Sequence, residues 1–200
     1  NYAKTKESTL LDVKDFEAIA GKGVIGTVAG KHVALGNAKL MEQVGATIAT
    51  ANSYALHRSR LAPVGLEDKL SELIDTALAQ ANTARNAAGI GRVAGALGPL
   101  LASYRPDLKP DPVDAAKKFA EIVRLMAGKV DLYLIETVSS VGEAEGTLAG
   151  CAAADKPVWL ALSVMDDDGS RLRSGEALSD VAPLIERFNP DAVLINCTRP

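Results

Sequence analysis

The sequence Asp191-Ala-Val-Leu-Ile-Asn-Cys197 places a short apolar run directly before an amide and a thiol side chain. A run of this length, bounded by polar residues, is typical of a buried strand. Similar runs precede it, and we expect strands near residues 46–51, 92–97, 131–135, 158–164 and 192–196. Helical patterns separate them, near residues 66–88, 112–127, 140–154 and 178–188. This alternation predicts repeated βα units around a parallel sheet, and therefore an α/β fold.

Two of the predicted helices begin with recognisable capping residues. Asp111 precedes Pro112, and an N-cap aspartate followed by a proline is a common helix start. Ser140 and Glu143 have the spacing of a capping box. About five βα units are too few to close an eight-stranded barrel, so we expect a sheet that is open or completed by further sequence.

The residues that follow the predicted strands are the candidates for function, because the loops after the strands carry the chemistry of an α/β barrel. These positions hold Asn52, Glu136, Ser163 and Cys197. Each also has a structural interpretation, since Asn and Ser commonly cap loops and a free Cys is often a small buried apolar side chain. Glu136 directly follows an apolar run, and a carboxylate there needs a cationic or hydrogen-bonding partner.

Other polar residues carry weaker signals. The run Asp166-Asp-Asp-Gly169 lacks the remaining ligands of a calcium loop, and we interpret it as a solvated turn. His32 and His57 have no companion ligands at a metal-binding spacing. Cys151 lies among small residues of a predicted helix, so we expect it to pack in the core.

The composition excludes several classes of protein. With 200 residues, 48% of them hydrophobic, and a net charge of −3, the chain belongs to the soluble globular class. The absence of basic stretches argues against nucleic acid as a partner. The apolar runs are too short to span a membrane, and the N-terminus has no signal-peptide pattern.

The two cysteines fit a reducing cytosol, so a cytoplasmic location is expected. We interpret the chain as a fragment at both ends, because it begins without Met and stops just after a strand.

Five segments, in order and spacing, resemble the homocysteine S-methyltransferase family. They are Asn52-Ser-Tyr-Ala-Leu-His-Arg58, Gly95-Ala-Leu-Gly-Pro-Leu100, Glu136-Thr-Val-Ser-Ser140, Lys156-Pro-Val-Trp-Leu-Ala-Leu-Ser163 and Leu194-Ile-Asn-Cys-Thr198. The resemblance covers about residues 46–200 and implies a partial (β/α)8 TIM barrel. It also implies transfer of a methyl group to the sulfur of homocysteine, from S-methylmethionine, S-adenosylmethionine or betaine. The partners would be these small molecules, and neither nucleic acid nor a membrane.

The same resemblance implies a Zn²⁺ cofactor and particular site residues. Cys197 corresponds to the first of three thiolate zinc ligands, and Glu136 to the carboxylate that holds the amino acid acceptor. Asn52 and Ser163 are assigned to the substrate pocket on the same rim. Zinc would remove the proton of a thiol, whose ordinary pKa is about 8.5, and three thiolates leave a fourth position for the substrate sulfur. The paired cysteines of the family would lie beyond Pro200, so the expected zinc site is incomplete. The first strand of the family's barrel is also absent from this sequence.

Residues 1–45 resemble a different family, through Asp15-Phe-Glu-Ala-Ile-Ala-Gly-Lys-Gly-Val-Ile-Gly-Thr-Val28 and His32-Val-Ala-Leu-Gly-Asn-Ala-Lys-Leu-Met41. These segments are similar to the nucleotide-binding domain of heavy-metal (copper) P-type ATPases. The resemblance would place four residues beside an adenine nucleotide: Gly21, Gly23, Gly36 and Asn37. The phosphorylated aspartate and the membrane helices of that family are missing, which argues against ATP-driven transport. From the residues alone we expect a short β-hairpin, 24–28 with 32–35, followed by a helix, 38–44.

The two resemblances meet near Val44-Gly-Ala-Thr47, without a linker rich in Gly, Ser or Pro. We therefore interpret residues 1–45 and 46–200 as two partial domains, joined either by the assembly of two gene fragments or by a natural fusion. Three functions remain open. The chain could be a methyltransferase fragment, a nucleotide-binding fragment of a heavy-metal P-type ATPase, or a barrel remnant that serves only as a folding or interaction unit.

Overall fold

The computed structural model describes residues 13–20, 23–28, 31–36, 45–89, 91–108 and 110–199. Its contacts divide the chain into two compact units. The smaller unit comprises residues 1–47 and 83–91, and the larger unit comprises residues 48–82 and 92–200. The smaller unit carries an antiparallel sheet and the larger unit a parallel one.

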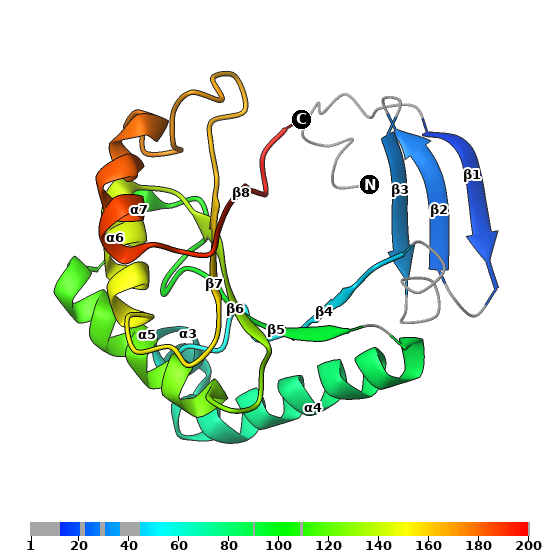
Figure 1. Ribbon diagram of the computed structural model, residues 1–200, viewed down its shortest axis with the longest axis horizontal. Helices are drawn as coiled ribbons and strands as arrows, with labels where there is room; N and C mark the ends of the chain where they lie inside the picture. Colours follow the sequence, from blue (N-terminus) through cyan, green and yellow to red (C-terminus); the bar gives the residue numbers. More distant parts are fainter. Residues whose placement is uncertain are drawn as a thin grey trace. The chain divides into compact units, whose positions relative to one another are not determined.

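The larger unit is built on a five-stranded sheet in the order β4-β5-β6-β7-β8, and every neighbouring pair is parallel (Figure 1). Each strand lies next to its successor in the chain, as consecutive strands do in a (β/α)8 barrel. The predicted α/β class is confirmed, although β4 is shorter and β6 longer than expected. The strands are β4 (Ile48–Thr50), β5 (Arg92–Leu97), β6 (Leu132–Val138), β7 (Val158–Leu162) and β8 (Ala192–Ile195).

Helices connect these strands, and α5, α6 and α7 cover the same face of the sheet (Figure 1). The longer helices are α4 (Leu70–Ala88), α5 (Pro112–Met126), α6 (Val141–Gly150) and α7 (Ala182–Phe188). Two 3₁₀ turns, η2 (Glu67–Lys69) and η4 (Leu178–Val181), form the first turns of the helices predicted at 66–88 and 178–188. Three further short turns were not expected from the sequence: α3 (Arg58–Leu61), η1 (Ala62–Val64) and η3 (Pro106–Leu108). No helix among the described residues is both long and apolar enough to cross a membrane.

Both predicted helix starts are confirmed. The Asp111 side chain accepts a hydrogen bond from the Val113 amide at 2.9 Å, at the start of α5. At the start of α6, Ser140 Oγ accepts from the Glu143 amide at 3.2 Å. The Glu143 carboxylate in turn accepts from the Ser139 amide at 2.8 Å, one residue before the N-cap. These bonds satisfy amide groups that have no partner within the helix.

An apolar core fills the space between the sheet and the helices. It includes Val93, Leu97, Phe119, Ile122, Met126, Leu148, Leu160 and Leu162. Cys151 is buried in the same core, as predicted from its small neighbours. In contrast, the edge strand β8 leaves Val193, Leu194 and Ile195 exposed.

Helices α5 and α6 approach each other closely because two glycines of α6 face α5. A Cβ atom on Gly146 would lie 2.7 Å from the Cβ of Ala115. A Cβ atom on Gly150 would collide with the Cβ of Phe119 and lie 2.9 Å from the carbonyl oxygen of Ala116. Only glycine leaves room for this contact between the two helices.

The smaller unit contains three antiparallel strands in the order β1-β2-β3. The predicted hairpin corresponds to β2 (Gly23–Val28) and β3 (Lys31–Gly36), in which Gly23 pairs with Gly36. Strand β1 (Val13–Ile19) was not expected from the sequence. Its pairing with β2 shifts register between Lys14 and Glu17, at Asp15 with a φ of 52°. The predicted helix at 38–44 lies outside the described residues.

Candidate functional site

The parallel strands end at one edge of the sheet, and the candidate site lies at this rim. Cys197 follows β8 and is exposed, with a left-handed backbone φ of 52°. Ser163 follows β7 and is fully buried. Glu136 and Thr137 lie in the last part of β6, where the pairing with β7 shifts register. The structure thus gathers carboxylate, hydroxyl and thiol groups at one edge, as the sequence predicted.

Thr137 connects the end of β6 to the end of β8. Its hydroxyl donates a hydrogen bond to Cys197 Sγ at 3.4 Å, and its amide donates to Asn196 Oδ1 at 3.1 Å. The Asn196 amide nitrogen donates back to Thr137 Oγ1 at 3.4 Å. Thr137 is buried and has a φ of 62°, which is rare for a β-branched residue. Such a conformation persists only where surrounding contacts hold it.

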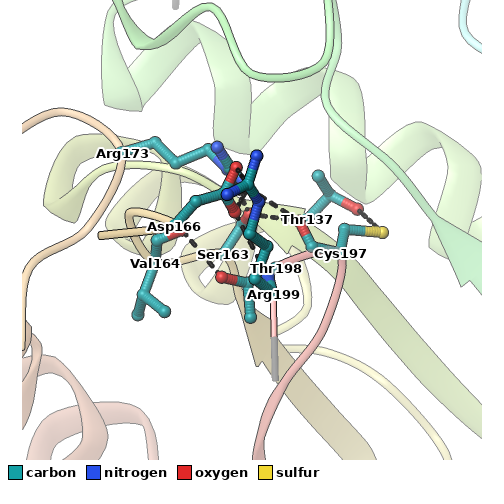
Figure 2. A network of polar contacts seen from close by, with 8 residues as sticks. All are labelled: Thr137, Ser163, Val164, Asp166, Arg173, Cys197, Thr198 and Arg199. Atoms are coloured by element: carbon teal, nitrogen blue, oxygen red, sulfur yellow. Dashed lines mark hydrogen bonds and ion pairs between the residues drawn. The ribbon is translucent and has the colours of Figure 1, made fainter. Parts of the chain in front are cut away.

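Arg173 holds the backbone of the Cys197 loop from the opposite side, as Figure 2 shows. Its guanidinium group donates to the Cys197 carbonyl oxygen at 3.0 Å, to Ser163 Oγ at 2.8 Å and to Asp166 Oδ1 at 2.8 Å. Ser163 Oγ in turn donates to the same Cys197 carbonyl oxygen at 3.3 Å. The guanidinium also lies 4.9 Å from the centre of the Tyr104 ring, close enough for a cation–π contact.

Asp166 has a more specific role than the solvated turn expected for its acidic run. It accepts from Arg173 and also from the Arg199 amide, at 3.2 Å, and the first of these bonds is the main cause of its lowered pKa. Asp168 fits the turn interpretation, because it accepts hydrogen bonds from the amide and the hydroxyl of Ser170. The run therefore forms an exposed turn whose first carboxylate anchors the arginine at the rim.

Glu136 is half-buried, and burial raises its pKa. Its carboxylate makes no hydrogen bond or ion pair with any residue that the structure describes. It borders a narrow cavity of ≈ 20 Å³, which is room for about one water molecule. A buried carboxylate without a counter-charge favours the approach of a cationic group.

An open depression lies beside Cys197, with a volume of ≈ 520 Å³. Its wall is formed by Tyr104, Asp166, Arg173, Cys197, Thr198 and Arg199. The neighbouring Cys197 side chain and partial burial raise the pKa of the Tyr104 hydroxyl. The exposed thiol therefore faces a hollow that is large enough for a small-molecule ligand.

The other sequence-predicted residues lie apart from this network. Asn52 is exposed in the turn after β4, and no hydrogen bond joins it to the residues of the network. Its neighbour Ser53 is buried and donates to the Ala96 carbonyl oxygen at 2.9 Å. Of the four predicted nucleotide contacts, Gly23 and Gly36 pair across the β2–β3 hairpin. Gly21 and Asn37 lie outside the described residues.

Thr137 was expected at this rim, because it follows Glu136 at the end of an apolar run. Two contributors to the rim were missed from the sequence: Tyr104 and Arg173. No sequence signal distinguished Tyr104 or Arg173, because each reaches the rim through the folding of a loop.

A zinc ion has one donor of suitable chemistry here, since thiolate is a preferred zinc ligand and Cys197 is accessible. The part of the chain that the structure describes holds no group of three His, Cys, Asp or Glu residues able to bind a metal. The described residues therefore do not form a zinc site by themselves.

Comparisons with known proteins identify two regions of similarity. The family model described as homocysteine S-methyltransferase matches residues 40–200. Over 43 residues, the chain is 56% identical to a copper-exporting P-type ATPase of Legionella pneumophila, which is 22% of this chain and 6% of that protein. A copper-exporting P-type ATPase of Staphylococcus saprophyticus is 44% identical over 41 residues, 20% of this chain and 5% of that protein.

Among solved structures, the chain is similar to the homocysteine methyltransferase MmuM from Escherichia coli. The metallated form gives a TM-score of 0.69 and 26% identity, covering 78% of this chain and 59% of that chain. The oxidized form gives a TM-score of 0.71 and 25% identity, and the match covers 80% of this chain and 60% of that chain. The chain thus spans about three fifths of the length of MmuM.

Proposed function

The chain belongs to the homocysteine S-methyltransferase family, whose model matches residues 40–200, and from this we propose that it takes part in methyl transfer to the thiol of homocysteine. The methyl donor would be S-methylmethionine, S-adenosylmethionine or betaine. The observation that carries the proposal is the accessible Cys197 thiol at the strand-end rim, held by Thr137 and Arg173 beside an open depression.

Glu136 is proposed to bind the acceptor amino acid. Its half-buried carboxylate has no partner among the described residues, and its pKa is raised. The ammonium group of homocysteine would supply the missing positive charge and favour the ionised carboxylate. Because the adjoining cavity has a volume of only ≈ 20 Å³, the rest of the substrate would lie in more open space along the rim. Ser163 and Asn52 are proposed as secondary contributors to this pocket.

Cys197 is proposed as one ligand of a Zn²⁺ ion, with further ligands supplied from outside the described residues. Zinc, when bound, lowers the pKa of a coordinated thiol and presents a thiolate to the methyl donor. Thr137 and Arg173 would fix the Cys197 side chain and carbonyl group, so that the ligand is held in one orientation.

The proposed reaction is direct displacement at the methyl carbon. A bond forms between the homocysteine sulfur and the methyl carbon as the bond from that carbon to the donor's sulfur or nitrogen breaks. The donor leaves with the electron pair of the broken bond, and the thiol proton is lost to solvent. The rim contributes by holding acceptor and donor in line, which converts a bimolecular encounter into an oriented one.

The test is homocysteine binding by the 200-residue chain, measured by isothermal titration calorimetry, because turnover would also need the zinc ligands that the described residues do not supply. We expect saturable binding that Zn²⁺ strengthens. Cys197→Ser should remove this gain, whereas the buried Cys151→Ala serves as the matched control and should retain it. A gain that Cys197→Ser retains would refute the role of the thiol. Absence of homocysteine binding would refute the proposed function.

A second function is favoured by the similarity of 43 residues to a copper-exporting P-type ATPase. We propose weak binding of an adenine nucleotide at the β2–β3 hairpin, where Gly23 pairs with Gly36. A fluorescent ATP analogue should bind the chain and bind more weakly to Gly23→Val. If the analogue does not bind, or binds both proteins equally, this second function is wrong.

A further inference from the structure

A second cavity lies away from the rim, between the α3–η2 segment and helix α5. Its volume is ≈ 320 Å³. Its apolar wall is formed by Leu70, Leu100 and Ile122, all of which are buried core residues. The proposed function uses none of the residues that line it.

Two buried polar groups in the wall of this cavity have no hydrogen-bond partner among the described residues. His57 is 1% exposed, and neither of its ring nitrogens makes a hydrogen bond within that part of the chain. The backbone of Gly98 and Tyr54 lies near the ring, but outside hydrogen-bonding geometry. The second group is Oε2 of Glu67, a buried atom that no residue described by the structure pairs with. Orphaned buried polar atoms are rare in folded proteins, and each requires an explanation.

The His57 ring is neutral at physiological pH, because burial and then the nearby charge of Arg60 lower its pKa to about 4. A neutral imidazole offers one hydrogen-bond donor and one acceptor. The ring packs edge-on against Phe119, with 5.6 Å between the ring centres, which fixes its orientation. His57 is therefore a positioned polar group without a charge of its own.

Of the two cationic side chains that line the cavity, one is available to bind an anionic group of a ligand. Arg58 is already engaged, because it pairs with Glu121 at 2.8 Å and donates to the Glu67 carbonyl oxygen at 2.8 Å. Lys118 makes no hydrogen bond or ion pair with any described residue. Two cations and two carboxylates line the cavity, so their formal charges cancel. An overall neutral ligand with separated charges is complementary to this arrangement.

We propose that this cavity binds a small zwitterionic amino acid with an aliphatic side chain. The ammonium group would donate to Glu67 and His57, and the carboxylate would pair with Lys118. The aliphatic side chain would lie against Leu70, Leu100 and Ile122. Trapped water would satisfy the two orphaned groups, but it would give no role to the apolar wall or to the free ammonium of Lys118.

The chain contains only two histidines, so the His57 ring can be observed directly by NMR spectroscopy. L-Leucine is the probe, because it has the required charges and no sulfur. We expect its addition to shift the His57 ring signals saturably, with a dissociation constant on the order of 1 mM. The His32 signals should not move. 3-Methylbutylamine and 4-methylpentanoate each lack one charge and should bind more weakly.

Variants of exposed residues separate this site from the rim. Lys118→Ala should weaken leucine binding by about tenfold. The control is Lys117→Ala, which should leave leucine binding unchanged, because Lys117 is the adjacent residue on α5 and already pairs with Asp114. Glu67→Gln should also weaken binding. Glu136→Gln should have no effect, which distinguishes this cavity from the proposed acceptor site. Failure of leucine to shift His57, or equal binding by Lys118→Ala, would overturn the proposal and leave trapped water as the explanation.

Discussion

The guanidinium group of Arg173 donates a hydrogen bond to the backbone carbonyl oxygen of Cys197 at 3.0 Å. The same group donates to Ser163 and Asp166, so one side chain joins the loop after β7 to the loop after β8 (Figure 2). Cys197 has a left-handed backbone, which few residues other than glycine adopt without support. Arg173 supplies that support from one side and Thr137 from the other.

Arg173→Met is expected to destabilise the fold and loosen the Cys197 loop. The methionine keeps most of the side-chain length but removes hydrogen bonds from a charged donor whose side chain is only 21% exposed. We expect a loss of about 2 kcal/mol in the free energy of unfolding, measured with urea. Arg171→Met is the matched control, because that side chain is 53% exposed, and its loss should stay below about 1 kcal/mol. Equal losses for the two variants would contradict the supporting role of Arg173.

The two cysteines are expected to differ strongly in reactivity. Cys197 is exposed, whereas Cys151 is buried and burial raises its pKa to about 12. Only a thiolate reacts with a disulfide reagent, so Cys151 should be inert in the folded chain. Ellman's reagent should therefore label one thiol in buffer and both in concentrated urea. Cys197→Ser should abolish the rapid reaction, and a fast second reaction in buffer would show that Cys151 is accessible.

Glu136→Gln is expected to raise stability at neutral pH while weakening homocysteine binding. Burial raises the pKa of Glu136, so the folded chain retains its proton at pH values where the unfolded chain has lost it. The contribution of Glu136 to stability therefore falls as pH rises from the ordinary carboxyl pKa to the raised one. Glutamine carries no charge and avoids this loss.

The pH dependence provides the check on Glu136. Urea unfolding should show Glu136→Gln more stable than the parent at pH 7, with the difference shrinking towards pH 4, where a carboxyl is mostly protonated in both states. Glu121→Gln is the control, because Glu121 pairs with Arg58 and its loss should not stabilise the chain. A parent chain that is more stable than Glu136→Gln at pH 7 would show that the carboxylate has a partner.

The sequence predicted the parts of the fold that depend on local pattern. The apolar runs located the five parallel strands, and Asp111 and Ser140 marked two helix starts, because capping requires particular side chains at fixed positions. Strand β1 was missed because the bulge at Asp15 breaks the alternation of side chains that identifies a strand. The one-turn helix α3 is too short to show a period.

At the rim, Cys197, Ser163 and Glu136 could be predicted, because the carboxyl ends of parallel strands share one edge. Arg173 could not. Its position depends on the turn at 165–172 folding back, through the pairing of Val164 with Leu172. That pairing joins residues of a loop without periodicity, and nothing in the local sequence distinguishes Arg173 from the exposed Arg171. The orphaned nitrogens of His57 were equally hidden, because burial is a property of the tertiary packing.

Gly150→Ala is expected to destabilise the larger unit through the contact between α5 and α6. Two effects oppose each other in this variant. The first is stabilising, because alanine has a higher helix propensity than glycine by up to about 1 kcal/mol. Overpacking costs about 1–3 kcal/mol, and here the added methyl group would meet the backbone of Ala116 at 2.9 Å and of Ala120 at 3.2 Å. Backbone atoms within a helix cannot rotate away, so the loss should exceed the gain.

The control for this contact is Gly169→Ala, where an added Cβ atom would have no neighbour within 4 Å and the backbone φ is not left-handed. We expect its free energy of unfolding to stay within about 0.5 kcal/mol of the parent, against a loss of about 1–2 kcal/mol for Gly150→Ala. Since Gly150 ends α6, the helix-propensity gain is at the lower end of its range. A neutral or stabilising Gly150→Ala would mean that the two helices lie farther apart than in this structure.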